Sequence, residues 1–166
     1  MHSLTYRRLN TALPGDTADF QRVFRGTPSF VFPTGGRAPT DAEVLAMMNT
    51  VPNGRDSEDV FIYTISMESK LCGCSVTVRG YPKPDAAYLA LRMIVESAQG
   101  NSLGSRVLKH IEVEAKSWGC SSLSGVVDSM NERALKFWLR EGFVEKFRKV
   151  AHGFMGQAVG IEKAGL

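Results

Sequence analysis

Hydrophobic positions recur along this chain with two periods, one typical of helices and one typical of strands. Spacings of three and four residues predict helices over residues 16–25, 40–48, 103–118 and 129–139. Alternating or continuous apolar segments predict strands over residues 4–9, 60–67, 71–78, 87–95, 122–127, 143–151 and 157–161. This order of elements predicts a mixed α/β fold (α+β) in a single domain over residues 1–166.

Short polar signals mark where several of these elements begin or end. Thr40 is followed three residues later by Glu43, and Ser129 by Glu132, so each pair predicts a capping box at the start of a helix. The polar turn 68–70 separates two predicted strands and therefore predicts a hairpin.

The apolar segment 87–95 predicts a central strand buried on both faces, and Arg92 is the residue that interrupts it. A small-residue loop then leads into the helix that begins at residue 103, whose first carboxylate is Glu112. Many helices carry an acid in the first turn, so here the positive end of the dipole is left open, with Arg106 close by. Such an end suits a phosphate or pyrophosphate, although a loop without any ligand has the same pattern.

The composition is that of an ordinary globular protein, with 43% hydrophobic and 22% charged residues among 166. No apolar run approaches the roughly 20 residues that a membrane-spanning helix needs. The first residues also lack the apolar core of a signal peptide, so we expect a cytoplasmic protein without a membrane partner. The net charge of +3 is small and the basic residues are scattered, so no nucleic-acid partner is expected.

The three cysteines do not predict a disulfide framework, because their number is odd in a chain without a secretion signal. Cys72 and Cys74 would share one face of a strand, with no histidine or second cysteine pair nearby to complete a zinc site. We therefore expect these two and Cys120 to be small buried hydrophobic residues. The three histidines show no ligand spacing either, so no metal is expected.

Two segments resemble the signature of the GNAT superfamily of N-acetyltransferases. Residues 99–104 (Gln-Gly-Asn-Ser-Leu-Gly) are similar to the family loop Gln/Arg-x-x-Gly-x-Gly/Ala, with Ser102 in place of its first glycine. The family segment Asn-x-x-Ala-x-x-Phe/Leu-Tyr followed by Gly-Phe is matched by Asn131, Ala134, Phe137, Gly142 and Phe143, with Trp138 at the tyrosine. The two motifs occur in the family's order, and the resemblance covers residues 60–161.

The resemblance implies a central mixed, mostly antiparallel sheet flanked by helices, with an acyl-CoA cleft where the sheet splays open. It implies acetyl-CoA as co-substrate, with its pyrophosphate at loop 99–105 and its pantetheine arm along the end of the central strand. The implied cofactor-binding residues are Met93, Ile94, Val95, Gln99, Gly100, Asn101, Ser102, Leu103, Gly104, Ser105, Asn131, Ala134, Phe137 and Trp138. A serine at 102 requires a backbone conformation that is not restricted to glycine.

Several of these positions have a second interpretation from the residues alone. Asn131 also suits the start of a helix, and the side chains of Ala134, Phe137 and the strand residues also suit a hydrophobic core.

The implied reaction is direct attack of a substrate amine on the acetyl thioester while both substrates are bound. The amine has a pKa near 10.4 and must lose a proton, which calls for a base. Tyr88 lies on the central strand, and Asp85, Glu96 and Asp128 flank the expected cleft, but no spacing singles out one of them. Trp138 cannot act as the acid that the family tyrosine provides, so it would line the cleft or leave that role to the Tyr88 hydroxyl.

A non-catalytic acyl-CoA-binding or sensing module is the alternative, because Trp138 replaces the tyrosine and the central strand carries no carboxylate. A nucleotide-binding P-loop and a dinucleotide fingerprint are both excluded by the spacing of residues in the loop. The acceptor amine, on a small molecule or a peptide, is not specified by the sequence; Phe30, Phe32 and Arg37 would line its cleft or cover the core. The expected assembly is a monomer or a homodimer.

Overall fold

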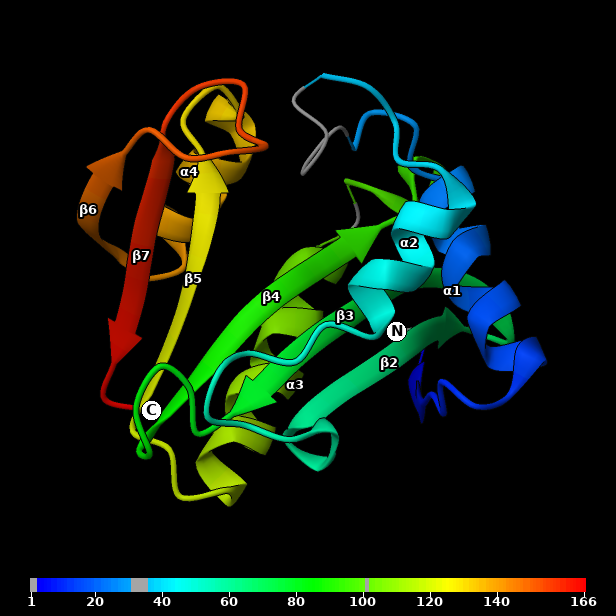
Figure 1. Cartoon of the computed structure of the whole chain (residues 1–166), viewed down its shortest axis with the longest axis horizontal. Coiled ribbons are helices and arrows are strands. Elements are labelled where there is room, and N and C mark those ends of the chain that lie inside the picture. The colour runs from blue at the N-terminus through cyan, green and yellow to red at the C-terminus, as the bar shows by residue number, and fades with distance from the viewer. Residues whose placement is uncertain (1–2, 31–35, 101) are drawn as a thin grey trace.

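The computed structural model describes residues 3–30, 36–100 and 102–166, which form a seven-stranded sheet flanked by helices (Figure 1). The strands are β1 (Leu4–Arg8), β2 (Val60–Met67), β3 (Lys70–Arg79), β4 (Ala86–Ile94), β5 (Ser122–Asp128), β6 (Val144–Lys149) and β7 (Ala158–Ala164). The helices of the described part are α1 (Pro14–Arg25), α2 (Asp41–Met48), α3 (Leu103–Ser117) and α4 (Glu132–Arg140), with short 3-10 helices η1 (Ser57–Asp59) and η2 (Glu96–Ala98). The predicted order of elements is confirmed, with boundaries shifted by a few residues.

The strand order across the sheet is β1-β2-β3-β4-β5-β7-β6. Neighbouring strands are antiparallel except for β4 and β5, which run parallel. The mixed, mostly antiparallel sheet implied by the family resemblance is therefore confirmed. The parallel pair needs a crossover connection, and α3 provides it.

Helices cover both faces of the sheet, with α1 and α2 in front and α3 behind in the view of Figure 1. Neighbouring residues of β2 point to opposite faces: the Tyr63 hydroxyl donates to Glu114 of α3 (2.7 Å), and Ile62 lines a cavity together with Met48 of α2. The buried hydrophobic side chains of these helices are Phe20, Val23, Phe24, Val44 and Met48 from α1 and α2, and Leu103, Val107, Leu108, Ile111 and Ala115 from α3.

Asp16 ties α1 to the end of β1. Its Oδ1 accepts from the guanidinium of Arg7 (2.7 Å), and its Oδ2 accepts from the backbone N–H of Asn10 (2.7 Å). Hydrogen bonds from Asn10 and Arg7 hold the pKa of Asp16 below its usual value. The contact therefore stabilises the ionised carboxylate in the folded protein.

One of the two predicted capping boxes is correct and the other is wrong. The Thr40 hydroxyl accepts from the Glu43 N–H, and the Glu43 carboxylate accepts from the Thr40 N–H. The cap of α4, however, is Asn131, whose side chain accepts from the Ala134 N–H (3.1 Å). The Ser129 hydroxyl lies too early in the chain for this role, and it accepts from a backbone N–H before β7 (2.8 Å).

The prediction for the cysteines is confirmed, since Cys72, Cys74 and Cys120 are all buried and free. Burial raises the pKa of Cys72 and, more strongly, that of Cys74. Both thiols are therefore held in the unreactive protonated form. In the described ranges, no cluster of potential metal ligands and no helix long and apolar enough to cross a membrane is found.

Candidate functional site

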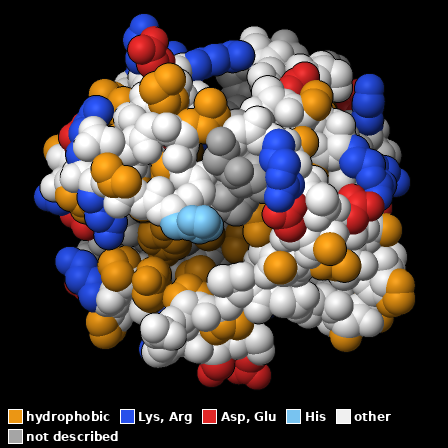
Figure 2. All heavy atoms as spheres, turned by 45° about the horizontal axis from the view of Figure 1, so that its top comes forward, with side chains coloured by type: hydrophobic (Ala, Val, Ile, Leu, Met, Phe, Trp, Pro, Cys, Tyr) orange, Lys and Arg blue, Asp and Glu red, His pale blue; other side chains and the backbone are white. Residues whose placement is uncertain are grey.

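The sheet opens between β4 and β5. The two strands pair over Ala86–Tyr88 and Ser122–Ser124, and beyond this point β5 pairs with β7 alone. Figure 1 shows the strands diverging toward their carboxyl ends. Figure 2 turns that end forward and shows a hollow with hydrophobic side chains inside it. The expected splayed centre of the sheet is therefore present.

Strand β4 is irregular beside this opening. Val76 of β3 pairs with Leu91 and Thr77 pairs with Leu89, so Ala90 is an extra residue that forms a β-bulge. Ala90 is exposed, while Leu91 and Arg92 are half-buried. The prediction that this strand is buried on both faces is wrong at its centre, because β5 moves away and leaves one side uncovered.

The backbone of β4 presents alternate residues to the opening. The Val95 N–H donates to Cys72 of β3 (2.9 Å), so Val95 belongs to a hydrogen-bonded pair of this antiparallel ladder. Hydrogen-bonded pairs recur at every second residue of an antiparallel ladder, so the main-chain N–H and C=O groups of Met93 also face β3. The polar groups of Ile94 and Arg92 then face away from β3. Of the three strand residues predicted to contact the pantetheine arm, Ile94 is the one whose main chain faces the opening.

The loop after β4 is held against the end of that strand. The Gln99 carboxamide donates to the Ile94 carbonyl (2.9 Å), so this side chain positions the loop. Gly100 has φ of 87°, and Ser102 adopts φ 60° and ψ 14°, in the left-handed region. Serine can enter this region at some energetic cost, so the conformational requirement placed on Ser102 is met. Asn101 lies outside the described residues.

The first turn of α3 carries no acidic residue, as predicted. Leu103 is buried in the core, and the Ser105 hydroxyl donates to Glu141 at the end of α4. Gly104 lies against neighbouring side chains: a Cβ there would be 2.6 Å from Nη1 of Arg92 and 3.5 Å from Phe137. This helix start offers backbone N–H groups and has no acidic residue of its own, although the Glu141 carboxylate reaches Ser105 from α4; free N–H groups of this kind fit an anionic group.

Helix α4 borders the same region with aromatic side chains. Phe137 and Trp138 pack edge to face (5.0 Å between ring centroids), and Trp138 packs likewise on Phe143 (5.1 Å). Ala134, Phe137 and Trp138 are half-buried against the core. The carboxamide oxygen of Asn131 is engaged in the helix cap, which agrees with the alternative interpretation of that residue.

Sequence reasoning did not identify Arg92 as a residue of this site. Its guanidinium carbon lies 4.4 Å from the Phe137 ring centroid and 4.9 Å from that of Trp138. Its Nε is completely shielded from solvent and has no hydrogen-bond partner among the described residues. Burial lowers the pKa of Arg92 to about 10, and the charge of Glu141 opposes this shift. The signal available in the sequence was a single cation within an otherwise apolar strand.

Arg106, the cation that the sequence placed near the start of α3, lies on another side of the helix. Burial raises the pKa of Tyr6 of β1 and of Cys72 of β3, and the charge of Arg106 opposes both shifts. Arg106 is therefore directed toward β1 and β3, whereas Arg92 faces α4.

The structure places two of the candidate bases, Tyr88 and Glu96, far apart. Tyr88 lies where the strands begin to separate, and a strand rises about 3.3 Å per residue, so Glu96 is on the order of 20 Å away. Tyr88 packs edge-on against Tyr81 (5.4 Å), and burial raises the pKa of Tyr88. It therefore stays protonated at neutral pH, which suits a hydrogen-bond donor better than a base.

The carboxylates of Glu96 and Asp128 hold neighbouring loops in place. Glu96 accepts from the Ser29 backbone N–H (2.9 Å), and hydrogen bonding from Ser29 lowers the pKa of Glu96. Asp128 accepts from three backbone N–H groups, those of Met130 (2.9 Å), Met155 (2.7 Å) and Gly156 (3.0 Å). The lowered pKa makes the Glu96 carboxylate a weaker base, and the Asp128 carboxylate is occupied by its three donors.

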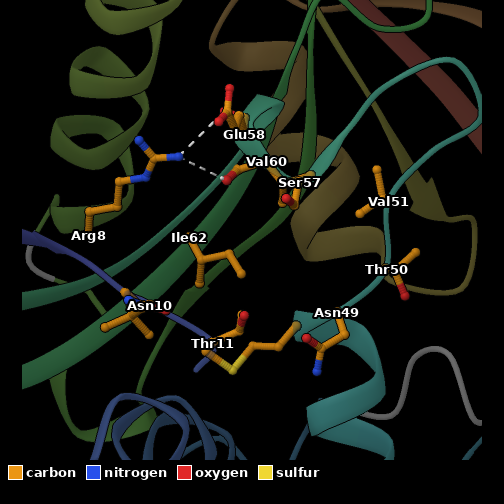
Figure 3. Close-up of a pocket in the computed structure, with 12 residues that line it drawn as sticks. Arg8, Asn10, Thr11, Asn49, Thr50, Val51, Ser57, Glu58, Val60 and Ile62 are labelled. Atoms are coloured by element: carbon orange, nitrogen blue, oxygen red, sulfur yellow. Dashed lines mark hydrogen bonds between the residues drawn. The ribbon is translucent and has the colours of Figure 1, made fainter. Parts of the chain in front are cut away.

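A separate cavity of about 450 Å³ lies between β1, β2 and the end of α2 (Figure 3). Arg8 borders it and donates to the carbonyls of Glu58 (3.5 Å) and Val60 (3.4 Å). None of its described lining residues belongs to β4 or β5, so this cavity is distinct from the strand opening.

Of the residues considered for an acceptor cleft, Phe30 packs edge-on against Phe24 and Arg37 pairs with Glu43. Phe32 lies outside the described residues.

A mixed sheet that splays between its parallel strands, with an acid-free helix start beside the opening, is the architecture that the resemblance implied. The chain matches the family model described as "Acetyltransferase (GNAT) family" over residues 18–143. It belongs to this family of acetyltransferases. Membership of this family agrees with acetyl-CoA as the expected co-substrate.

Solved structures share the fold. An acetyltransferase from Thermus thermophilus has 24% identity and a TM-score of 0.78, with 99% of each chain covered. A putative streptothricin acetyltransferase from Bacillus anthracis, in complex with acetyl coenzyme A, has 16% identity and a TM-score of 0.58, with 67% of this chain and 64% of that chain covered. A Bacillus subtilis acetyltransferase in complex with CoA has 16% identity and a TM-score of 0.57, with 66% of this chain and 80% of that chain covered. No curated protein matches the chain.

Proposed function

We propose that this protein transfers the acetyl group of acetyl-CoA to a primary amine of a small molecule or a peptide. The observation that carries the proposal is the opening between β4 and β5, which leads to the acid-free first turn of α3 in a GNAT acetyltransferase. The acetyl-CoA and CoA found in two structures of similar fold support the same co-substrate here.

In this proposal, different residues around the opening bind different parts of acetyl-CoA. We assign the pyrophosphate to the backbone N–H groups of residues 99–105, because the first turn of α3 has no acidic residue of its own. The pantetheine arm is peptide-like, so it would pair with the Ile94 main chain as an added strand does. Ala134 and Phe137 would flank the arm from the α4 side, and Trp138 would form a wall of the cleft.

Acetyl-CoA supplies an activated acyl group: the amine nitrogen bonds to the acetyl carbon, the C–S bond breaks, and the amine loses a proton. Tyr88, protonated at neutral pH, is suited to donate a hydrogen bond to the leaving sulfur. Glu96 and Asp128 are engaged with backbone N–H groups, so we assign the amine proton to water in the opening rather than to a strong base. Direct transfer in a ternary complex needs no covalent acetyl-enzyme.

The alternative is a non-catalytic acyl-CoA-binding module. The engaged carboxylates of Glu96 and Asp128, together with Trp138 in place of the family tyrosine, are the observations that favour it. Calorimetry with acetyl-CoA, followed by release of free CoA thiol in the presence of an amine panel, separates the two. Binding with amine-dependent thiol release supports the acetyltransferase. Binding without release for any amine supports the module, and the absence of binding refutes both.

We further propose that residues 1–166 form one GNAT domain. A cytoplasmic location, a monomeric or homodimeric state and the lack of a nucleic-acid partner remain predictions from the sequence.

A further inference from the structure

We propose that Arg92 binds the pyrophosphate of the CoA co-substrate from the sheet side, opposite the backbone N–H groups of the loop. This inference rests on the proposed function, because it requires CoA at the start of α3. It adds to the site a side-chain cation that lies within the central strand, at a position that neither sequence motif includes.

The first argument is that Nε of Arg92 has no hydrogen-bond partner among the described residues. This atom is completely shielded from solvent. Glu141 acts on the charge of Arg92, but the carboxylate of Glu141 already accepts from the Ser105 hydroxyl. A donor that is shielded from water and unpaired is energetically unfavourable, and an incoming anion would relieve this.

The second argument is the position of this cation at a helix start. Nη1 of Arg92 comes so close to the first turn of α3 that a Cβ at Gly104 would lie 2.6 Å from it. The amino end of a helix carries a partial positive charge, so a cation placed there is repelled. Helices favour anions at this end. The fold thus holds two positive groups together beside one carboxylate, that of Glu141, and a second anion would balance them.

The third argument is that the fold holds the guanidinium in place. It lies over the rings of Phe137 (4.4 Å) and Trp138 (4.9 Å), both of which belong to α4. Cation–π contacts of this kind restrict the orientation of the planar group. A glycine at 104 leaves the room that the guanidinium occupies. The arginine is thus positioned before the ligand arrives, and its fork of donors matches phosphate oxygens.

The anion that the proposed function brings to this turn is the pyrophosphate of CoA. Pantetheine is uncharged, and the 3′-phosphate lies on the far side of the adenosine moiety from the arm. CoA, dephospho-CoA (which lacks the 3′-phosphate) and pantetheine (which lacks all phosphates) therefore separate the possible contacts. The experiment measures the affinity of each by calorimetry for the natural chain and for Arg92→Met, which keeps an unbranched side chain without the charge.

We expect Arg92→Met to weaken CoA and dephospho-CoA equally, by roughly 10- to 100-fold, as for the loss of a charged hydrogen bond. Pantetheine binding should stay within about two-fold. The free Arg92→Met protein should also melt about 2–4 °C higher, because an unpaired donor that is shielded from water has been removed. Arg92→Lys keeps the charge and should lose less affinity than Arg92→Met. Arg140→Met is the matched control, since Arg140 contacts the same Phe137 ring (5.5 Å) from an exposed position and should change nothing.

Several results would overturn the inference. Unchanged affinity for dephospho-CoA would do so, as would an equal loss for pantetheine, which would indicate a general disturbance of the cleft. A lower melting temperature of free Arg92→Met would identify Arg92 as a structural residue. If the natural chain binds neither CoA nor dephospho-CoA, the proposed function fails. If it binds both and Arg92→Met binds them equally well, the Arg92 assignment alone fails.

Discussion

Gly104 is the position at which a single added charge tests the pyrophosphate site most directly. In Gly104→Asp, the new Cβ would lie 2.6 Å from Nη1 of Arg92, so the guanidinium must shift, and a carboxylate would occupy the first turn of α3. Two unit charges 4 Å apart interact by about 4 kcal/mol at an effective dielectric constant of 20. Allowing for screening and for pairing of the new carboxylate with Arg92, we expect acetyl-CoA affinity to fall by roughly 100- to 1,000-fold.

The same substitution should leave the free protein at least as stable as before. An acid in the first turn of a helix contributes about 0.3–1 kcal/mol, and it would give the buried Arg92 charge a partner. Gly104→Asn is the matched control, because its side chain has nearly the same shape and no charge. We expect Gly104→Asn to weaken acetyl-CoA binding much less than Gly104→Asp when both are measured by calorimetry. The difference in affinity between the two variants should decrease as the salt concentration rises, because salt screens the added charge.

Two results would refute this reasoning. If folded Gly104→Asp binds acetyl-CoA with unchanged affinity, the pyrophosphate does not lie at this turn. If Gly104→Asn loses as much affinity as Gly104→Asp, crowding of Arg92 rather than charge explains the effect. Melting curves of both variants without ligand establish that each protein is folded.

The remaining predictions concern one aromatic residue, the cysteines and one ion pair. Trp138→Phe keeps a ring in the cleft and should retain most of kcat; a drop of more than about 1,000-fold with intact acetyl-CoA affinity would show that the indole N–H acts in the transition state. Replacing Cys72, Cys74 or Cys120 by Ala should preserve activity, and initial rates should give intersecting lines with both substrates varied. Parallel lines or acetyl label on a cysteine would contradict direct transfer. Asp16→Asn should lower the free energy of unfolding by about 1–3 kcal/mol at pH 7. Because the folded pKa of Asp16 is depressed, this loss should shrink as pH falls below about 3.9 toward that lower pKa. An equal loss at pH 7 and pH 3 in chemical denaturation would argue against the ion pair.

Most of the elements could be predicted because their signals are local. The spacing of hydrophobic residues marks helices such as α3, and the Thr40–Glu43 capping box lies within one turn of chain. The cap of α4 was misassigned because Ser129 and Asn131 both have side chains that suit a helix cap. The choice between them depends on where the chain leaves β5, and the hydroxyl of Ser129 is engaged by a backbone N–H that comes 28 residues later.

The roles of the candidate bases could not be predicted, for a related reason. The backbone donor that engages Glu96 lies 67 positions away in the sequence. The N–H groups of Met155 and Gly156 that engage Asp128 lie 27 and 28 positions away. An acid flanking a cleft looks available in the sequence, and its actual partners become known only when distant loops meet.

The sequence by itself determined the order of elements, the acid-free start of α3 and the two motifs that mark the family, since each depends on residues close together in the chain. The tertiary structure alone decided that β4 is open on one side and what Arg92 faces. A run of apolar residues predicts that a segment is buried, but it does not identify the residues that cover the segment. Only the divergence of β5 from β4, with α4 packed beside it, uncovers Ala90 and leaves the Arg92 cation between aromatic rings and a helix start. Burial and charge pairing depend on three-dimensional neighbours, which short-range patterns do not specify.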